Sequence, residues 1–306
     1  MTLLVVGSVA LDTVTNQYGK IEDGLGGSAV YFSLAANPFC AVKMVAAVGT
    51  DFPQDHIDLL KRKNIDLDGL MTAPGRTFRW MGEYSPDLNN AKTLDTQLNV
   101  FEHFKPVLPA EYKVVQSLFL ANIDPVLQLN VLSQIENKAI VACDTMNYWI
   151  TQQKDDVMKV LQKVNLLFIN EEEAKMLSET KHITDCARFI LEHGPETVII
   201  KRGASGVAVF QEHNVFVAPA HCVATPVDTT GAGDSFAGGF MGFLTRAGDT
   251  SWATVKRAAV VGTIIASFNI ESFSIHRLNL LKTSEIQQRW QTFSHMTEFQ
   301  AEPALF

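Results

Sequence analysis

The sequence predicts an α/β protein of three layers, with a mostly parallel central sheet covered by helices on both faces. Short apolar runs recur along the chain, and segments with helical periodicity follow them. The runs are continuously apolar rather than alternating, as is typical of strands buried on both faces. The repeated strand–helix order favours parallel βαβ units.

The individual elements follow from this pattern. Buried strands are expected at residues 3–7, 42–49, 117–122, 139–144, 164–170 and 197–203. Helices are expected at residues 28–36, 53–63, 125–136, 154–163, 171–178 and 184–193. A helix that begins near Asp234 is apolar on nearly all sides, so we expect it in the core, and another helix should cover 251–268.

Two stretches, 13–25 and about 72–105, interrupt this rhythm. Both are more polar, are punctuated by Gly, Pro and Asn, and contain short strand-like pieces. We expect them to form a small β-rich lid inserted into a single domain of residues 1–306, with a plain surface hairpin as the alternative.

Composition excludes several classes of function. With 47% hydrophobic and 19% charged residues the chain is an ordinary globular protein, and a net charge of −8 argues against a nucleic-acid surface. Its four cysteines (Cys40, Cys143, Cys186 and Cys222) form no CxxC pair and are predicted to be buried thiols of a reducing cytosol. The N-terminal residues are typical of a core strand rather than a signal peptide, and no apolar run is long enough to span a bilayer. We therefore expect a cytoplasmic protein without a membrane partner.

Polar residues collect at the ends of the predicted strands. Asp12 follows the first strand, Asn122 and Asp124 follow the third, and Asp144 and Asn170 end the fourth and fifth. Ligands of open α/β sheets bind beyond the carboxyl ends of the strands. The sequence therefore predicts a site at this edge.

The stretch DTTGAGDSFAGGF, which begins at Asp228, precedes the buried helix. Its residues Gly231, Ala232 and Gly233 allow close backbone approach, and their N–H groups would point along the helix axis toward an anion. The loop nevertheless begins and ends with acids, Asp228 and Asp234. The alternative is a glycine-rich turn with Asp234 as an ordinary helix-start acid.

DTTGAGDSFAGGF resembles the C-terminal motif of the ribokinase-like (PfkB-type) carbohydrate and nucleoside kinases. GLGGSAVYFSLA (24–35) resembles the diglycine motif of this family, NEEE (170–173) its Asn-x-x-Glu motif, and KRGASG (201–206) its strand-to-glycine turn. These motifs occur in the family's order, so the resemblance covers nearly the whole chain. It implies a ribokinase-like fold and an ATP-dependent kinase that phosphorylates a hydroxyl of a small sugar.

The resemblance also assigns roles around the glycine loop. It implies that Asp234 is the general base that deprotonates the acceptor hydroxyl, while Gly231, Ala232 and Gly233 form an anion hole for the transferred phosphoryl group. Asp228 would lie beside a monovalent cation, usually potassium. The alternative for Asp228 is that its side chain caps the turn.

Asn170 and Glu173 have two interpretations. Their spacing after a strand is that of a helix capping box. The resemblance implies that the pair also contacts the nucleotide phosphates and, through water, Mg²⁺ carried with ATP.

Three further residues are expected to flank the nucleotide on resemblance. These are Lys201, Gly203 and Gly206, although the two glycines also suit an ordinary hairpin turn. Asn269, in the segment SFNIES, is expected near the adenine.

On the acceptor side, Asp12, Gly26 and Gly27 match positions that hold substrate hydroxyls in the family, and Asn122 is expected to join them. A buried carboxylate discriminates against analogues that lack the hydroxyls it accepts. The chain departs from the pattern at Tyr31, where sugar kinases often carry Asn. Tyr31 would stack on a nucleobase, reshape a sugar pocket or simply belong to the core.

The predicted lid carries Phe78, Arg79, Trp80 and Tyr84. Its aromatic side chains suit a nucleoside base or a homodimer contact through the lid. Arg79 suits a phosphate already on the substrate, or it is only a solvated strand residue.

Three alternatives to a sugar kinase follow. The first is a nucleoside kinase of the same family, and the second is a non-catalytic nucleotide-binding sensor, against which the intact Asp234 counts. The third, a dinucleotide-dependent oxidoreductase, requires GxGxxG after the first strand, where this chain has GSVALD.

Overall fold

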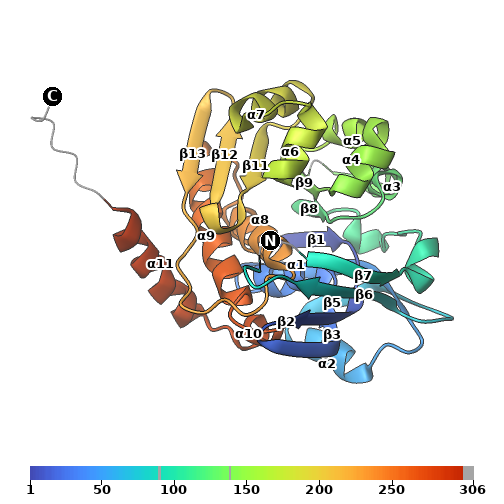
Figure 1. Cartoon of the computed structure of the whole chain (residues 1–306). Helices are drawn as coiled ribbons and strands as arrows, with labels where there is room; N and C mark the ends of the chain where they lie inside the picture. The colour runs from blue at the N-terminus through green and yellow to red at the C-terminus, as the bar shows by residue number, and fades with distance from the viewer. Residues whose placement is uncertain (89–90, 138, 299–306) are drawn as a thin grey trace, which may run out of the picture.

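The computed structural model describes residues 1–88, 91–137 and 139–298, and it confirms the three-layer α/β/α fold (Figure 1). The central sheet has nine strands in the order β13-β12-β11-β10-β9-β8-β1-β4-β5. Their bounds are β1 Thr2–Val6, β4 Ala41–Gly49, β5 Ile65–Ala73, β8 Ser117–Leu120, β9 Ile140–Asp144, β10 Leu166–Asn170, β11 Thr197–Lys201, β12 Val207–Gln211 and β13 Asn214–Ala218. Only the β11–β12 and β12–β13 pairs are antiparallel.

Helices cover both faces of this sheet, and each face has its own apolar cluster. One face carries α1 Ser28–Ala36, α2 Gln54–Arg62, α8 Ala232–Ala247, α9 Trp252–Asn269, α10 His276–Leu280 and α11 Thr283–Thr297. The other carries α3 Pro125–Gln134, α4 Asn147–Gln152, α5 Lys154–Leu161, α6 Glu171–Ser178 and α7 Ile183–Glu192. None of these helices, which are those of the described residues, is long and apolar enough to span a membrane.

The strand order changes direction at β1, which pairs with β8 on one side and β4 on the other. Such a switch point opens a crevice beyond the carboxyl ends of the strands, where α/β proteins bind ligands. The chain leaves β1 here and enters a second sheet.

The second sheet has the order β3-β2-β6-β7, with β2 Ala10–Asn16, β3 Gly19–Gly26, β6 Phe78–Tyr84 and β7 Ala91–Gln97. Strands β2 and β6 are parallel neighbours although more than 60 residues separate them. These strands lie within or beside the predicted insertions 13–25 and 72–105, of which residues 89–90 lie outside the described residues. Figure 1 shows this sheet beside the carboxyl edge of the central sheet.

Close packing of α8 on α1 fixes the start of α8 at that edge. A Cβ atom on Gly238 would lie 2.3 Å from the Phe32 carbonyl oxygen, and one on Gly242 would lie 2.9 Å from the Ala36 backbone. Glycine at these positions lets the two helices approach to backbone contact. The GG pair that follows Asp234 in the motif is therefore a packing feature.

The structure corrects several expectations. Cys143 and Cys186 are buried as predicted, but Cys40 is half-buried and Cys222 is exposed. Strand β5 was not predicted because its sequence, IDLDGLMTA, is that of a polar edge strand with few buried residues. The segment from Gly203 to Gly206 is the turn of the antiparallel β11–β12 pair, which agrees with the hairpin alternative.

Candidate active site

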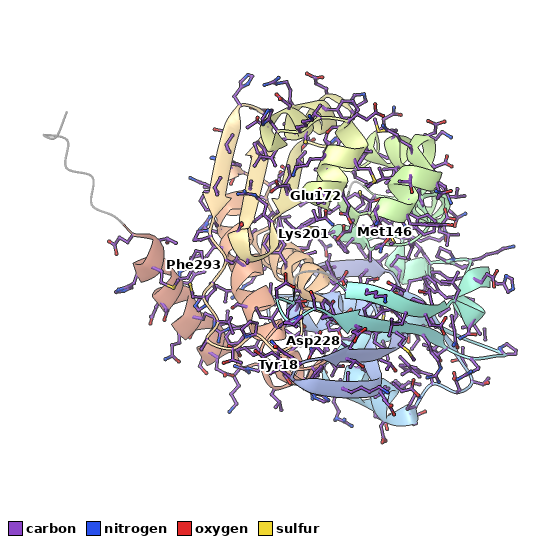
Figure 2. The ribbon with its side chains drawn as sticks, viewed as in Figure 1. Tyr18, Met146, Glu172, Lys201, Asp228 and Phe293 are labelled. Atoms are coloured by element: carbon purple, nitrogen blue, oxygen red, sulfur yellow. The ribbon has the colours of Figure 1, made fainter. Side chains whose placement is uncertain are left out.

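The site forms where the start of α8 meets the end of β11 and the second sheet. Figure 2 shows Lys201 on the side of the central sheet and Asp228 on the side of the second sheet. Asp234 lies in the first turn of α8, and the charge of Asp234 acts on both Asp12 and Lys201. The fold thus brings residues from opposite ends of the sequence to the predicted edge.

The glycine loop lies directly on the ring of Tyr31. Gly231 caps α8 with a φ of 71°, and a Cβ atom on it would lie 2.3 Å from the Tyr31 ring. Both the positive φ and the close ring require glycine here. Tyr31 itself is only 2% exposed. Of the three roles considered for Tyr31, its burial agrees with the core role, and its ring packs against the glycine loop at Gly231.

The N–H groups of the loop are not equivalent. Ala232 N–H donates to the Thr229 carbonyl at 3.1 Å and closes a turn, whereas the expected role was to bind an anion. Gly233 lies in the first turn of α8, where N–H groups lack partners within the helix and favour an anion.

Asp234 is surrounded by charge. Its pKa is raised to about 7: burial is the largest cause and the charge of Asp144 adds to it, while the charge of Lys201 lowers the pKa. Lys201 Nζ lies 2.6 Å from Asp144 Oδ2 in a largely buried ion pair. Asp144 therefore lies at the edge where the strand-end residues predict a site, but its pairing with Lys201 was not foreseen.

Asn170 and Glu173 form the predicted capping box of α6. Glu173 N–H donates to Asn170 Oδ1 at 2.8 Å, and Asn170 N–H donates to Glu173 Oε2 at 2.9 Å. Burial raises the pKa of Glu173 to about 7, with Lys201 lowering and Asp144 raising it. Asn170 is exposed, whereas Glu173 is largely buried and its charge interacts with the charges of Lys201 and Asp144.

Asp12 is the buried acid of the second sheet. It is 6% exposed, and burial raises its pKa to about 7, while a hydrogen bond from Gly27 N–H lowers it and Asp228 and Asp234 raise it. A Cβ atom on Gly26 would lie 1.9 Å from Asp12 Oδ2. The diglycine pair thus makes room for the carboxylate and supplies a donor to it.

Asp228 is buried at the start of the glycine loop. Its Oδ1 accepts the Thr230 N–H at 2.9 Å, and its Oδ2 accepts the Ser274 N–H at 3.2 Å. Burial raises its pKa, and these hydrogen bonds lower it in part. The side chain therefore caps the turn, as the second of its two interpretations expects.

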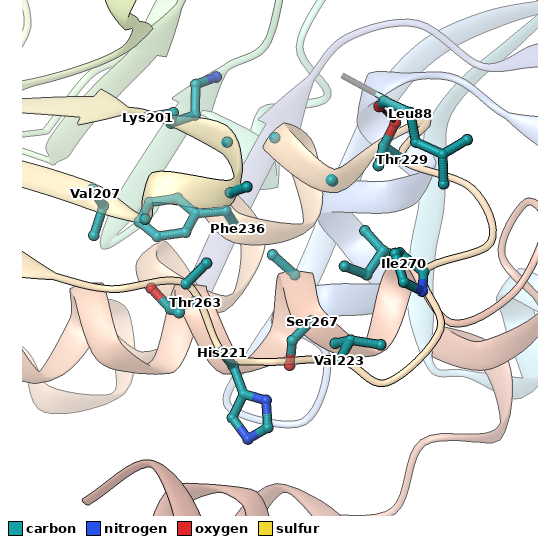
Figure 3. Close-up of a pocket in the computed structure, with 18 of the residues that line it drawn as sticks. Leu88, Lys201, Val207, His221, Val223, Thr229, Phe236, Thr263, Ser267 and Ile270 are labelled. Atoms are coloured by element: carbon teal, nitrogen blue, oxygen red, sulfur yellow. Dashed lines mark hydrogen bonds between the residues drawn. The ribbon is translucent and has the colours of Figure 1, made fainter. Parts of the chain in front are cut away.

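A pocket of about 570 Å³ adjoins the loop (Figure 3). Lys201, Gly203 and Gly206, which were expected to flank a nucleotide, line it together with Ala232 and Gly233. Sequence reasoning missed the opposite wall, formed by residues 220–223, Pro226, Thr263, Ala266 and Ser267. The apolar segment that directly precedes the DTTGAGD motif was the one signal in the sequence that could have indicated this wall.

Two expected ligand contacts are engaged in internal bonds instead. Asn269 is 1% exposed, does not line this pocket, and donates its amide N–H to the Thr230 carbonyl at 2.8 Å. Asn122 accepts the Trp149 indole N–H at 2.9 Å and donates to the Met146 sulfur at 3.2 Å. Asp124 caps α3 through the Val126 N–H.

The aromatic and basic residues of the second sheet are also engaged. Phe78 stacks on Phe101, and Trp80 donates to the Thr93 hydroxyl at 3.2 Å. Arg79 forms ion pairs with Asp23 and with Asp51, the latter at 3.0 Å. It is therefore a structural link rather than a solvated strand residue.

The fold and the residues gathered at the carboxyl edge of the central sheet define a class of protein, a ribokinase-like phosphotransferase. The pfkB family carbohydrate kinase model matches residues 2–274, and the chain belongs to this family. Its kinase activity is accordingly directed to a carbohydrate or a nucleoside, and members of this family use ATP with a divalent metal.

The chain is similar to several nucleoside kinases. The cytidine kinase of Thermococcus kodakarensis is 28% identical over 251 residues, which cover 80% of this chain and 89% of the relative. The nucleoside kinase of Methanocaldococcus jannaschii shares the fold with a TM-score of 0.79 at 20% identity, covering 95% and 98% of the two chains. The nucleoside kinase of Burkholderia thailandensis in complex with inosine has a TM-score of 0.77 at 15% identity, covering 95% and 97%.

Proposed function

We propose that this protein transfers the γ-phosphoryl group of ATP to a hydroxyl of a nucleoside, with Asp234 as the general base. The observation that carries the proposal is the position of Asp234. It lies between a pocket of nucleotide size, which ends at Lys201 and Gly233, and the buried Asp12 of the second sheet.

The environment of Asp234 suits proton transfer. A general base works best when its pKa lies near the operating pH, and burial raises the pKa of Asp234 to about 7. Lys201 favours its charged form, so the carboxylate is available to accept a proton from an acceptor hydroxyl. A neutral hydroxyl becomes a better nucleophile as this proton leaves.

The charge that develops on the phosphoryl oxygens has donors nearby. Gly233 lines the pocket and lies in the first turn of α8, where N–H groups lack partners within the helix and can donate to an anion. A Cβ atom on Gly233 would lie 3.3 Å from Lys201 Nζ, so the ammonium group adjoins the same backbone. In this proposal Gly231 contributes the positive φ at the start of α8, and Ala232 closes the turn.

The acids around Lys201 fit Mg²⁺ carried with ATP. Mg²⁺ is commonly held by one or two carboxylates together with water and phosphate oxygens, and Glu173 and Asp144 offer such carboxylates. Within the described residues no cluster of three or more His, Cys, Asp or Glu side chains could hold a metal alone, which agrees with a metal that arrives with the nucleotide. When bound, Mg²⁺ would neutralise phosphate charge.

The acceptor is proposed to bind through its ribose hydroxyls to Asp12 beside Gly26 and Gly27. The relatives that are cytidine and nucleoside kinases favour a nucleoside. Arg79 is neutralised by Asp23 and Asp51, which weighs against recognition of a phosphate on the acceptor. A free sugar is the second candidate, because the matching family model is that of carbohydrate kinases.

We further propose that the second sheet acts as a lid over both substrates. The Tyr84 hydroxyl lies 3.2 Å from the Thr230 hydroxyl, and the Leu88 carbonyl accepts the Thr229 hydroxyl at 2.7 Å. The β6–β7 hairpin therefore contacts the glycine loop directly. Strand β7 is exposed along its whole length, so it also offers an edge for the predicted homodimer.

Thermal stability against a panel of acceptors tests the proposal. Cytidine, inosine, adenosine, ribose, fructose and ribose 5-phosphate are compared in the presence of Mg²⁺ and a non-hydrolysable ATP analogue. A ligand at about 100 times its Kd stabilises the folded state by about 2.7 kcal/mol, so a shift is readily detected. We expect a nucleoside to give the largest shift and to be phosphorylated when ATP replaces the analogue.

The other results have defined meanings. A shift with ribose or fructose alone favours the second candidate. Binding of the nucleotide and an acceptor without ATP consumption favours the non-catalytic sensor. Absence of any nucleotide effect contradicts the assignment of the pocket beside Gly233.

A further inference from the structure

The surroundings of Asp228 do not fit the monovalent cation that the family resemblance implies. A bare monovalent cation needs several oxygen atoms that turn lone pairs toward it in place of its hydration shell. At Asp228 one carboxylate oxygen faces the N–H of Thr230 and the other faces the N–H of Ser274. Each N–H presents the positive end of its dipole to an oxygen that a cation would require.

The neighbouring main-chain oxygens are also hydrogen-bonded. The Ile270 carbonyl accepts the Val227 N–H at 2.7 Å and the Asp228 N–H at 3.4 Å. The Thr230 carbonyl accepts the amide of Asn269 at 2.8 Å. Hydrogen bonds within the chain thus already supply a positive partner to each of these oxygens, although the Thr230 carbonyl and the two Asp228 carboxylate oxygens can each accept a second one. The buried amide oxygen of Asn269 has no hydrogen-bond partner among the described residues.

The segment that provides one of these donors is held firmly in place. Ser274 has a φ of 52°, a left-handed conformation that is costly for a residue other than glycine. Its hydroxyl donates to the Leu25 carbonyl at 2.6 Å, which ties the turn to β3. The donor orientation at Asp228 is therefore built into the fold rather than incidental.

We infer that Asn269 is a positioning residue. Its amide and the N–H of Ser274 together hold the glycine loop in position, a role that a monovalent cation would otherwise have. Asn269 is buried at the end of α9 and bonds the residue that precedes Gly231. The inference rests on the proposed function, because it concerns the loop that would bind the transferred phosphoryl group. It implies a kinase whose activity does not depend on potassium.

Two measurements on the whole protein test this. The first is the melting temperature at constant ionic strength in potassium, sodium or tetramethylammonium chloride, the last cation being too large for the site. The second is kcat for transfer from ATP to cytidine in the same salts. We expect kcat to differ by less than about 2-fold and the melting temperature by less than about 2 °C, which is under about 1 kcal/mol for a chain of this size.

Variants separate positioning from simple stability. Asn269→Ala should lower kcat by about 10–100-fold with little change in KM for ATP, because small misplacements of catalytic groups are costly. Asn269→Asp replaces the donor with a carboxylate, so its kcat and melting temperature should become dependent on potassium. The matched control is Asn37→Ala, since Asn37 makes the same type of amide-to-carbonyl bond with Lys63 far from the site. It should lower the melting temperature without lowering kcat.

Other outcomes overturn the inference. These are a rise of several degrees in the melting temperature of the wild-type protein specific to potassium, activation of the wild-type protein by potassium alone, or an Asn269→Ala variant with normal kcat in tetramethylammonium. If cytidine is not phosphorylated in any salt, the proposed function fails for that acceptor, while the melting temperatures still decide the inference.

Discussion

The two sides of the glycine loop are built differently. On the acceptor side the polar groups are buried and already hydrogen-bonded: Asp12 accepts the Gly27 N–H, and Asp228 accepts two backbone N–H groups. On the nucleotide side the loop faces a pocket of about 570 Å³ with largely small and apolar walls. At one end of the pocket Lys201, which lines it, pairs with Asp144.

This difference indicates how each ligand is recognised. Prearranged carboxylates with raised pKa values select hydroxyl groups at fixed points, so the acceptor side should be specific and sensitive to single substitutions. A shaped apolar cavity binds through many weak contacts, so the nucleotide side should tolerate change. Asp234 lies between the two and should be the most sensitive position of all.

The largest expected effect is that of Asp234→Asn. Loss of the proton acceptor should lower kcat by about 10²–10⁴-fold and leave binding of the ATP analogue nearly unchanged. Steady-state kinetics and thermal shifts measure the two quantities. Asp185→Asn is the matched control, because Asp185 is an acid in the first turn of α7, outside the proposed site. An Asp234→Asn variant with near-normal turnover would remove Asp234 from the mechanism.

The next effect concerns Asp12. Asp12→Asn should raise KM for the acceptor by about 10–100-fold, because a hydrogen bond to a charged group contributes about 1.5–3 kcal/mol. KM for ATP should stay within about 2-fold of the wild-type value, since the nucleotide pocket does not include this residue. Equal changes in KM for the acceptor and KM for ATP would contradict the proposed difference between the acceptor side and the nucleotide side of the loop.

The buried acids also make stability depend on pH. The pKa of Asp12 rises from 3.8 in the unfolded chain to about 7 in the folded protein. The folded protein therefore holds more protons between these values, and the free energy of unfolding falls as pH increases through this range. Denaturant unfolding of wild-type protein and Asp12→Asn from pH 4 to pH 8 measures this. This change in pKa corresponds to about 4 kcal/mol, so we expect the wild-type protein to lose up to about 4 kcal/mol more than the variant, and parallel curves would contradict it.

The smallest effect is expected at the outer wall of the nucleotide pocket. Arg289 of α11 donates to the Ser267 hydroxyl at 2.9 Å and lies over the Phe268 ring at 3.5 Å. Arg289→Met keeps much of the packing but removes the donor, so KM for ATP should rise by about 2–10-fold, the equivalent of one ordinary hydrogen bond. The acceptor KM should not change. Kinetics with ATP and GTP would show whether the wall also affects the choice of base.

The sequence was sufficient for the three-layer fold because the parallel strands β1, β4, β8, β9, β10 and β11 each carry a signal of continuous hydrophobicity. The antiparallel strands β12 and β13 were not predicted. The sequence also failed where hydrophobicity is weak, as at β5, and where no motif exists, as at α11. Lys201 was placed by the family resemblance, and Asp144 was placed at the site's edge by its position at the end of a strand. Their pairing could not be predicted, because the β9–β10–β11 order that brings them together is a property of the sheet.

The sequence could not predict the internal hydrogen bonds of two side-chain amides. Asn122 and Asn269 have the composition of ligand contacts, but both are bonded within the protein, to Trp149 and to Thr230. A sequence shows that a residue is able to donate a hydrogen bond, not which acceptor lies nearest in three dimensions. Tyr31 shows the same limit, since only the contact with Gly231 reveals its supporting role.

The family match ends at residue 274, yet α11, which begins at Thr283, reaches the nucleotide pocket from outside. Phe293 stacks against His221 of the pocket wall, and Arg289 bonds Ser267 of the same wall. Two kinases with identical motifs can therefore differ in the surface that surrounds the base. A small-molecule inhibitor that extends from the base pocket toward α11 would distinguish this enzyme from relatives that share its catalytic residues.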